Sequence, residues 1–281
     1  MHQAKTDSQA VDFSMHQGWE QVDSQRRKFV YQWGSQQDYD ATVLISHGLG
    51  EHGGRYMRLA QDFAAHGLRV VCFDQQGHGK SPEKRGCVDS YESMLDDIGA
   101  MLQWIGREKP TVLFGHSMGG NLVMNYTLRR NFQPACVIAS SPMIEAVRPP
   151  ARPLEFLLRC LMRLVPNRCI SSHTKPEKLM SDPSEQAALR NDEVFHSSLS
   201  LRLGAALLDS GRWLLQNNPS PPVPLLLSHG SADQKTCHKA SIRFAELTHE
   251  NCQLEILADH MHDPFRDVDR EEALEIFFRF I

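Results

Sequence analysis

The segment Gly115–Gly119 (Gly-His-Ser-Met-Gly) restricts the possible folds of this chain more than any other. It follows an apolar run of β type, Thr111–Phe114, and precedes a helix-type run that begins at Asn121. A strand, a tight turn and a helix in this order form a nucleophile elbow, which holds a serine hydroxyl exposed at the end of a strand. Both glycines are needed, because a β-carbon at either position would collide with the neighbouring helix or strand. The helix N-terminus favours developing negative charge nearby, so the segment predicts a nucleophile at Ser117.

Strand-type runs alternate with helix-type runs along most of the chain. The strand-type runs are Arg27–Trp33, Ala41–Ser46, Leu68–Phe73, Thr111–Phe114, Ala135–Ala139, Val223–Ser228 and Cys252–Leu257. The helix-type runs are Tyr56–His66, Tyr91–Arg107, Asn121–Arg130, Lys235–Thr248 and Glu271–Ile281. This alternation predicts a mainly parallel sheet covered by helices on both faces.

The alternation stops between residues 141 and 222, where prolines cluster at both edges and the interior is predicted to contain helices only. We therefore expect a core formed by residues 1–140 and 223–281, interrupted by a helical cap at 141–222. One cap helix carries an apolar stripe formed by Leu154, Leu157, Leu158, Leu161 and Val165. Two compatible interpretations remain: the stripe is buried within the cap, or it receives an apolar substrate or touches lipid.

Length and composition exclude several classes of protein. With 281 residues, 41% of them hydrophobic, the chain suits one large α/β domain or a core with an insertion. A net charge of −4 without a basic run predicts no nucleic-acid partner. Neither a signal-peptide pattern nor a stretch of roughly 20 apolar residues is present, so we expect a cytoplasmic protein, with peripheral membrane contact through the cap as an option. Seven cysteines without paired spacing fit reduced thiols, and the scattered histidines predict no metal or cofactor.

A serine hydroxyl requires a base, and the base requires an orienting carboxylate. In a sheet of this type, both come from loops after later strands, in the chain order serine, acid, histidine. Asp233 ends the loop after the strand at 225–228 and is predicted to be the acid, although it could also cap the next helix. The loop after 254–257 offers His260 and His262. We predict His262 as the base, because it lies just ahead of the last helix, and expect His260 to face solvent.

Ester chemistry also requires two backbone N–H groups that bind the oxyanion. One is expected from Met118, which follows the serine. The other is expected from the loop after the strand at 42–45, where glycines at 48 and 50 let the backbone turn inward and Leu49 becomes the candidate donor.

These segments together resemble the α/β-hydrolase superfamily, and within it the monoacylglycerol lipase and lysophospholipase branch. The resemblance is carried by His47–His52 (His-Gly-Leu-Gly-Glu-His) with Arg55-Tyr56, by Phe73–Ser81, by the elbow and by the acid and histidine loops. It covers roughly residues 13–281, although the cap aligns only loosely. It implies a sheet of eight strands with one antiparallel edge, and a cap that admits single-chain lipids. Gln75-Gln76 and His262-Asp263 depart from the family's usual basic residue and His-Glu pair.

The expected activity is hydrolysis of carboxylic esters of single-chain lipids, either monoacylglycerol or lysophospholipid, through an acyl-enzyme. The cap arginines could meet a phosphate head group or form a solvated face, so the head group stays open. These arginines are Arg148, Arg152, Arg159, Arg163 and Arg168. A serine aminopeptidase, an acyltransferase and a non-catalytic hydrolase-like binding protein remain alternatives; an acidic cluster in the cap would favour the peptidase, and none is evident. The oligomeric state does not follow from the sequence.

Overall fold

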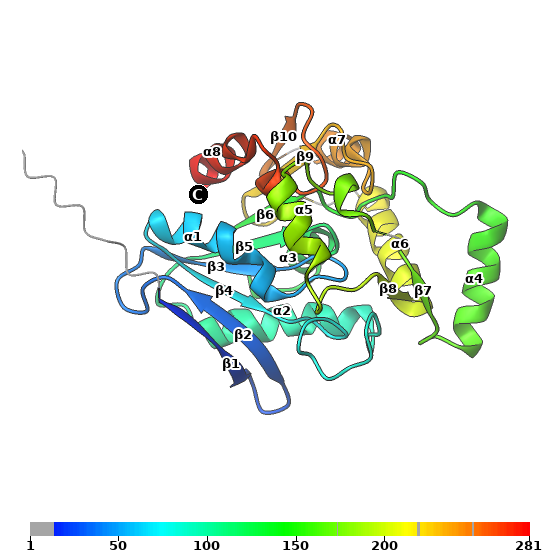
Figure 1. Ribbon diagram of the computed structural model, residues 1–281, viewed down its shortest axis with the longest axis horizontal. Helices are drawn as coiled ribbons and strands as arrows, with labels where there is room; N and C mark the ends of the chain where they lie inside the picture. The colour runs from blue at the N-terminus through cyan, green and yellow to red at the C-terminus, as the bar shows by residue number, and fades with distance from the viewer. Residues whose placement is uncertain (1–13, 173, 218–219, 249) are drawn as a thin grey trace, which may run out of the picture.

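The computed structural model describes residues 14–281 except 173, 218–219 and 249. An eight-stranded sheet in the order β1-β2-β4-β3-β5-β6-β9-β10 forms its centre (Figure 1). The strands are β1 (Met15–Gln21), β2 (Arg27–Trp33), β3 (Ala41–Ser46), β4 (Leu68–Phe73), β5 (Thr111–His116), β6 (Cys136–Ser140), β9 (Leu225–Gly230) and β10 (Cys252–Leu257). Within this sheet β2 runs antiparallel to both of its neighbours, and all other neighbouring strands are parallel. The expected mainly parallel eight-stranded sheet is confirmed.

Helices cover both faces of the sheet, as the alternation of the sequence predicts. The α-helices of the described chain are α1 (Met57–Ala65), α2 (Tyr91–Ile105), α3 (Met118–Arg129), α4 (Arg152–Leu164), α5 (Pro183–Arg190), α6 (Leu201–Gln216), α7 (His238–Leu247) and α8 (Arg270–Phe280). One apolar cluster joins the sheet to α1 and α8, and a second joins the opposite face to α2, α3, α6 and α7. The central strand β5 serves both clusters, since Phe114 enters the first and Leu113 the second. Because β5 is buried on both faces of the sheet, its sequence is a continuous apolar run.

The edge strand β1 was not among the predicted strands. Its residues are exposed or half-buried, so they lack the apolar signal of the inner strands. Trp19 packs edge-on against Phe29 of β2, with ring centroids 5.7 Å apart. The strand is therefore specified by pairing with β2 rather than by its own hydrophobic pattern.

The segment between β6 and β9 contains α4, α5 and α6 and also two short strands, β7 (Cys169–Ser171) and β8 (Ser198–Ser200). These strands pair antiparallel with each other, so the expectation of helices only was wrong. Three residues per strand are too few to show a period of two in the sequence. Among the described residues, no helix combines the length and the apolar content needed to cross a bilayer.

Two helices of this segment differ sharply in their packing. Helix α6 inserts Leu203, Leu207 and Leu214 into the cluster beneath it, and its Gly211 approaches the backbone of Ile144 closely. Helix α4 has no buried residue and stands apart from the sheet, beside α6 (Figure 1). The apolar stripe predicted on α4 exists, but Leu157, with 54% of its surface exposed, is not buried within the segment.

The close approach of α3 to β3 generates a stability prediction. A β-carbon on Gly119 would lie 1.9 Å from the carbonyl oxygen of Ser46, where no flexible side chain can yield. We expect Gly119→Ala to lower the free energy of unfolding by about 1–3 kcal/mol or more, measured by urea denaturation. Gly18→Ala, on β1 with no atom within 4 Å of the added carbon, is the matched control and should stay within about 0.5 kcal/mol of the wild type. Equal midpoints for the two variants would contradict this packing.

Candidate active site

Ser117 lies at the turn between β5 and α3 with a positive φ of 54° and a ψ of −113°. Its N–H donates to the carbonyl oxygen of Ser140 (3.0 Å), and its carbonyl oxygen accepts from the N–H groups of Asn121 (3.0 Å) and Met143 (2.9 Å). These bonds hold a backbone conformation that an isolated serine would avoid. The local geometry is that of the predicted elbow.

The structure brings the three predicted side chains together at the carboxyl ends of parallel strands. His262 Nε2 lies 2.9 Å from Ser117 Oγ, and His262 Nδ1 lies 2.7 Å from Asp233 Oδ2. Asp233 comes from the loop after β9, and His262 comes from the loop after β10. Serine, imidazole and carboxylate thus form a continuous hydrogen-bonded line, the arrangement that lets an imidazole accept a hydroxyl proton.

Asp233 is buried and accepts hydrogen bonds from several groups besides His262. Thr236 Oγ1 donates to Oδ2 (2.6 Å), His229 Nε2 lies 3.1 Å from the same oxygen, and the N–H groups of Lys235 (2.6 Å) and Thr236 (3.0 Å) reach Oδ1. Burial alone would raise the pKa of Asp233, but His262 and His229 lower it below its ordinary value. The carboxylate does not cap α7, whose N-cap is Cys237, so the helix begins later than predicted.

His229 and Thr236 were missed in the sequence. His229 stands inside a fully buried strand, where an imidazole needs partners, and it finds them in Asp233 and in Ser241 Oγ (2.8 Å). The sequence did offer a signal for His229: it lies near the end of an apolar strand and four residues before the candidate acid Asp233. Thr236 carried no signal, because its role depends on the loop conformation.

His262 and His260 differ in their surroundings. Burial lowers the pKa of His262, but the charge and hydrogen bond of Asp233 outweigh this and raise the pKa above its ordinary value. His260 is also buried, with 5% of its surface exposed, so the expectation that it faces solvent was wrong. Its ring nitrogens lie 3.1 Å from the carbonyl oxygens of Ala258 and Asp269, and it has no hydrogen bond to Ser117 or Asp233.

Leu49 and Met118, the residues of the two predicted oxyanion donors, line the same cavity as Ser117. Within the described part of the chain, neither backbone N–H has an acceptor. The Leu49 loop turns at Gly50, whose φ is +80° and whose missing β-carbon would collide with the carbonyl oxygen of His196.

A buried carboxylate, Glu51, supports this loop from behind. Its Oε2 accepts from the N–H of Gly48 (2.9 Å) and from Tyr56 Oη (2.6 Å). Its Oε1 accepts from Arg266 (2.7 Å) and from Arg55 (3.2 Å). Burial would raise the pKa of Glu51, but the two guanidinium groups hold it well below the ordinary value.

The same network continues to the elbow. Arg266 also donates to Asp263 Oδ2 (2.9 Å), and Asp263 Oδ1 lies 2.9 Å from His116 Nε2. The rings of His116 and His262 are 4.8 Å apart. Ligand-type atoms of His116, His262 and Asp263 lie within 4.8 Å of one another, but hydrogen bonds within the site already engage both imidazoles and the carboxylate. We therefore assign this cluster to hydrogen bonding and not to a metal.

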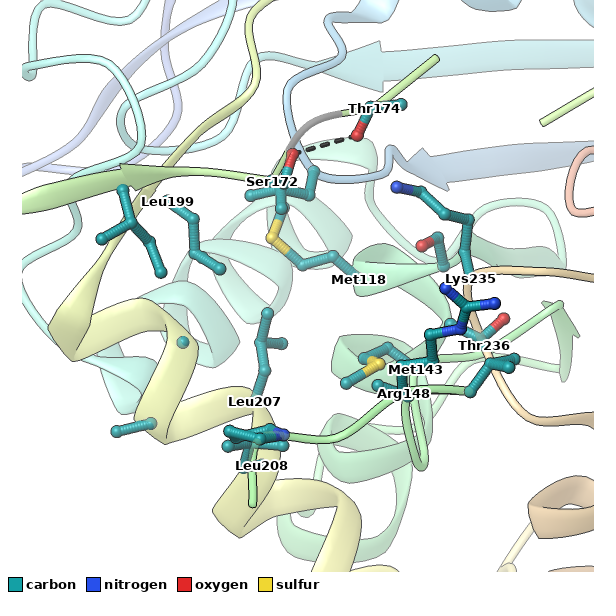
Figure 2. A pocket seen from close by; sticks show the side chains of 18 of the residues that line it. Met118, Met143, Arg148, Ser172, Thr174, Leu199, Leu207, Leu208, Lys235 and Thr236 are labelled. Atoms are coloured by element: carbon teal, nitrogen blue, oxygen red, sulfur yellow. Dashed lines mark hydrogen bonds between the residues drawn. The ribbon is translucent and has the colours of Figure 1, made fainter. Parts of the chain in front are cut away.

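A cavity of about 780 Å³ opens in front of Ser117. Met118 and Met143, which follow β5 and β6, line it together with Leu207 and Leu208 of α6 (Figure 2). From α4, Leu154 and Leu158 reach the same space. A mainly apolar cavity of this size, with the reacting groups in its wall, suits an elongated apolar ligand.

Comparison with known proteins identifies the family. Residues 37–269 match the family described as serine aminopeptidase, S33. The chain belongs to this family. It is an α/β-hydrolase of the monoglyceride lipase-like branch, and the resemblance inferred from the motifs is confirmed.

The relatives match over most of this chain. An uncharacterized abhydrolase domain-containing protein of Dictyostelium discoideum is 31% identical over 244 residues, which cover 86% of this chain and 26% of that protein. The chain thus spans about a quarter of that relative. A monoacylglycerol lipase of Mycolicibacterium smegmatis is 27% identical over 254 residues, which cover 88% and 90% of the two chains. The crystal structure of Paleococcus ferrophilus monoacylglycerol lipase superposes with a TM-score of 0.81 at 28% identity, covering 90% of this chain and 97% of the other.

Proposed function

We propose that this protein hydrolyses carboxylic esters of single-chain lipids, monoacylglycerol or lysophospholipid, through a covalent acyl-enzyme. The observation that supports the proposal is the line from Ser117 Oγ through His262 to Asp233 in the wall of a mainly apolar cavity. The relatives described as monoacylglycerol lipases support the same substrate class.

The proposed reaction has two halves. His262 Nε2 accepts the hydroxyl proton while Ser117 Oγ attacks the ester carbonyl carbon, and the resulting oxyanion accepts hydrogen bonds from the N–H groups of Leu49 and Met118. The ester C–O bond then breaks, and His262 returns the proton to the departing alcohol. Water repeats the sequence on the acyl-enzyme and releases the fatty acid. Asp233 holds the proton on Nδ1 and stabilises the imidazolium.

We propose that residues 141–222 form the cap of this site, over a core formed by 1–140 and 223–281. The core contributes the serine, acid and histidine, and α4 and α6 contribute an apolar wall with Leu154, Leu158 and Leu207. Such a wall suits the acyl chain, because burying apolar surface favours binding by about 25 cal/mol per Å².

The charges of the cavity argue against the aminopeptidase alternative. Its lining carboxylates are Glu155 and Asp233 among the described residues. Glu155 is paired with Arg159 (2.9 Å) and Arg212 (2.6 Å), and Asp233 is bound to His262. Neither carboxylate is free to bind the ammonium group of a peptide N-terminus, so an ester is the better substrate.

Substitution of the nucleophile tests the mechanism. We expect Ser117→Ala to lower the turnover of monoacylglycerol by about 10³-fold or more and to abolish labelling by a fluorophosphonate, with the free energy of unfolding nearly unchanged. His262→Ala should be similarly inactive. His260→Gln, in the same loop, is the matched control and should retain turnover per labelled site. Loss of turnover in His260→Gln alone would contradict the assignment of the base.

The pH profile tests the role of Asp233. His262 must be neutral to accept a proton, so kcat/KM should fall as the pH drops through the pKa of His262. Because this pKa is raised, the midpoint should lie above pH 6.5. In Asp233→Asn the charge that raises the pKa is absent, so the rate should drop and the midpoint should move to lower pH. Titration of released fatty acid in a pH-stat measures both; an unshifted midpoint in this variant would refute the coupling.

We also propose that α4 contacts a lipid surface. Several of its apolar side chains are exposed and do not line the cavity, foremost Phe156 with 72% and Leu164 with 80% of their surface exposed. An amphipathic helix that keeps apolar side chains in water, beside the entrance to an apolar cavity, suits the interface of a membrane.

Vesicle binding tests this contact. We expect the double variant Phe156→Gln and Leu164→Gln to bind phosphatidylcholine vesicles about a hundredfold more weakly, or more weakly still, since each buried apolar side chain contributes about 1.5–3 kcal/mol. Its turnover of a short-chain monomeric ester should be unaffected. Val268→Gln, at a position with 63% exposure outside the cap, serves as the control for exposed apolar surface. Equal vesicle binding by the double variant and this control would rule out docking through α4.

A further inference from the structure

Three cations in the wall of the cavity lack a counter-charge. Arg148 and Lys178 are exposed at its rim, and Lys235 is half-buried. Among the described residues, no carboxylate forms an ion pair with any of the three, whereas Arg159, which also lines the cavity, is paired with Glu155 and Asp209. The cavity therefore carries three cations that are not engaged in direct ion pairs with any described residue, beside its apolar wall.

The backbone brings two of these cations next to each other. The N–H of Val147 donates to the carbonyl oxygen of Lys235 (3.0 Å), and Ala146 forms a β-bridge with Thr236. Lys235 thus lies within one of two paired backbone segments, and Arg148 directly follows the other. In Figure 2 they lie on the side of the cavity opposite Leu199 and Leu207.

Lys178 reaches the same region from a third segment. It is the last residue of the short helix η2 (Pro176–Lys178), and the next residue, Leu179, accepts a hydrogen bond from the N–H of Asp263 (2.8 Å). Asp263 follows His262 directly, and Lys235 lies two residues after Asp233. The backbone therefore places both lysines close in sequence to residues that are anchored at the Asp233 and His262 loops.

The electrostatics agree with this placement. Burial and the positive charge of Lys178 lower the pKa of Lys235, and the opposing effects of the Asp233 and Asp263 carboxylates are too small to offset them. Nearby acids are engaged elsewhere: Asp233 with His262, Asp263 with His116, and Glu177 with Arg190. A bound anion would offset the positive charge of Lys178 and Lys235.

We propose that Arg148, Lys178 and Lys235 form a subsite for the phosphate of a single-chain phospholipid, on the leaving-group side of Ser117. The proposal rests on the function proposed above and specifies its substrate. The acyl chain lies along the leucines, and the glycerophosphate lies against the cations. The hydroxyl groups of Ser172 and Thr174, 3.0 Å apart in the lining, offer further donors.

The subsite selects among head groups by charge. A phosphate monoester, or a phosphodiester with an uncharged alcohol, gains from all three cations. A choline ester places a quaternary ammonium against the same positive wall and gains less. The sequence offered five cap arginines as phosphate contacts. Arg152, Arg163 and Arg168 do not line the cavity, and Arg159 is paired with carboxylates. The proposed phosphate contacts are therefore Arg148 and the two lysines.

Matched substrates test the subsite. Octanoyl esters of glycerol, glycerol 3-phosphate and glycerophosphocholine, each below its micellar concentration, share one acyl chain and avoid recruitment to a surface. We expect kcat/KM for the glycerol 3-phosphate ester to exceed that for the glycerol ester by about tenfold, with the choline ester between them. Higher salt should reduce this ratio.

Charge-neutral variants assign the ratio to residues. Arg148→Gln, Lys178→Gln and Lys235→Gln should each lower the ratio of phosphate to neutral ester about twofold, and the triple variant should abolish the preference. Lys175→Gln and Lys239→Gln, neighbours in sequence that do not line the cavity, are the matched controls and should keep the wild-type ratio. Fluorophosphonate labelling reports the folded fraction of each variant. An unchanged ratio in the triple variant would overturn the proposal.

Inhibition distinguishes a lipid head group from free phosphate. Glycerol 3-phosphate should compete with the neutral ester in the wild type and not in the triple variant. Equal inhibition by inorganic phosphate would overturn the assignment to a glycerophosphate head group. Vigorous Ser117-dependent hydrolysis of the glycerol ester without a phosphate preference would refute the subsite alone, whereas no hydrolysis of any ester would refute the proposed function itself.

Discussion

The geometry of the site depends on the hydrogen bonds and ion pairs of the buried carboxylate of Glu51. This carboxylate holds the N–H of Gly48 on one side and Arg266 on the other, and Arg266 in turn holds Asp263, the neighbour of His262. The loops that follow β3 and β10 are thus joined by one ionic network. Taking these charges out of water is costly, and removing one partner from such a pair typically costs about 3–5 kcal/mol. The network therefore fixes positions, and its contribution to overall stability is secondary.

The polar groups of the site differ in how completely the protein satisfies their hydrogen bonds. Asp233 is saturated with hydrogen bonds from His262, His229 and Thr236, so it has little freedom to move or to become protonated. The N–H groups of Leu49 and Met118, in contrast, have no acceptor among the residues that the structure describes. The proposed mechanism uses this difference: the carboxylate that orients the base is held by the protein, and the proposed oxyanion donors are left for the substrate.

Much of this arrangement could be predicted from the sequence, because the signals are local. The elbow, the buried strands and the position of Asp233 each depend on a few consecutive residues and on chain order. Strand β1 could not be predicted, since its partner β2 specifies it, and neither could β7 and β8, which are too short to show a period. The burial of His260 depends on the carbonyl of Asp269, nine residues later.

Helical periodicity in the cap had a further limit. It predicted an apolar stripe on α4 but could not tell whether core, substrate or solvent meets it, because that depends on how α4 stands relative to α6. The sequence likewise could not predict that Arg148, Lys178 and Lys235 line one cavity, because their segments are brought together only by tertiary hydrogen bonds.

The positive φ of Ser117 limits which nucleophiles this scaffold accepts. Threonine carries the same hydroxyl group, but its second heavy atom on Cβ makes a positive φ markedly unfavourable. Aspartate, like serine, carries a single heavy atom on Cβ and so avoids this added crowding. A change of chemistry at this turn is therefore open to a carboxylate and closed to the alcohol that is chemically nearest to serine.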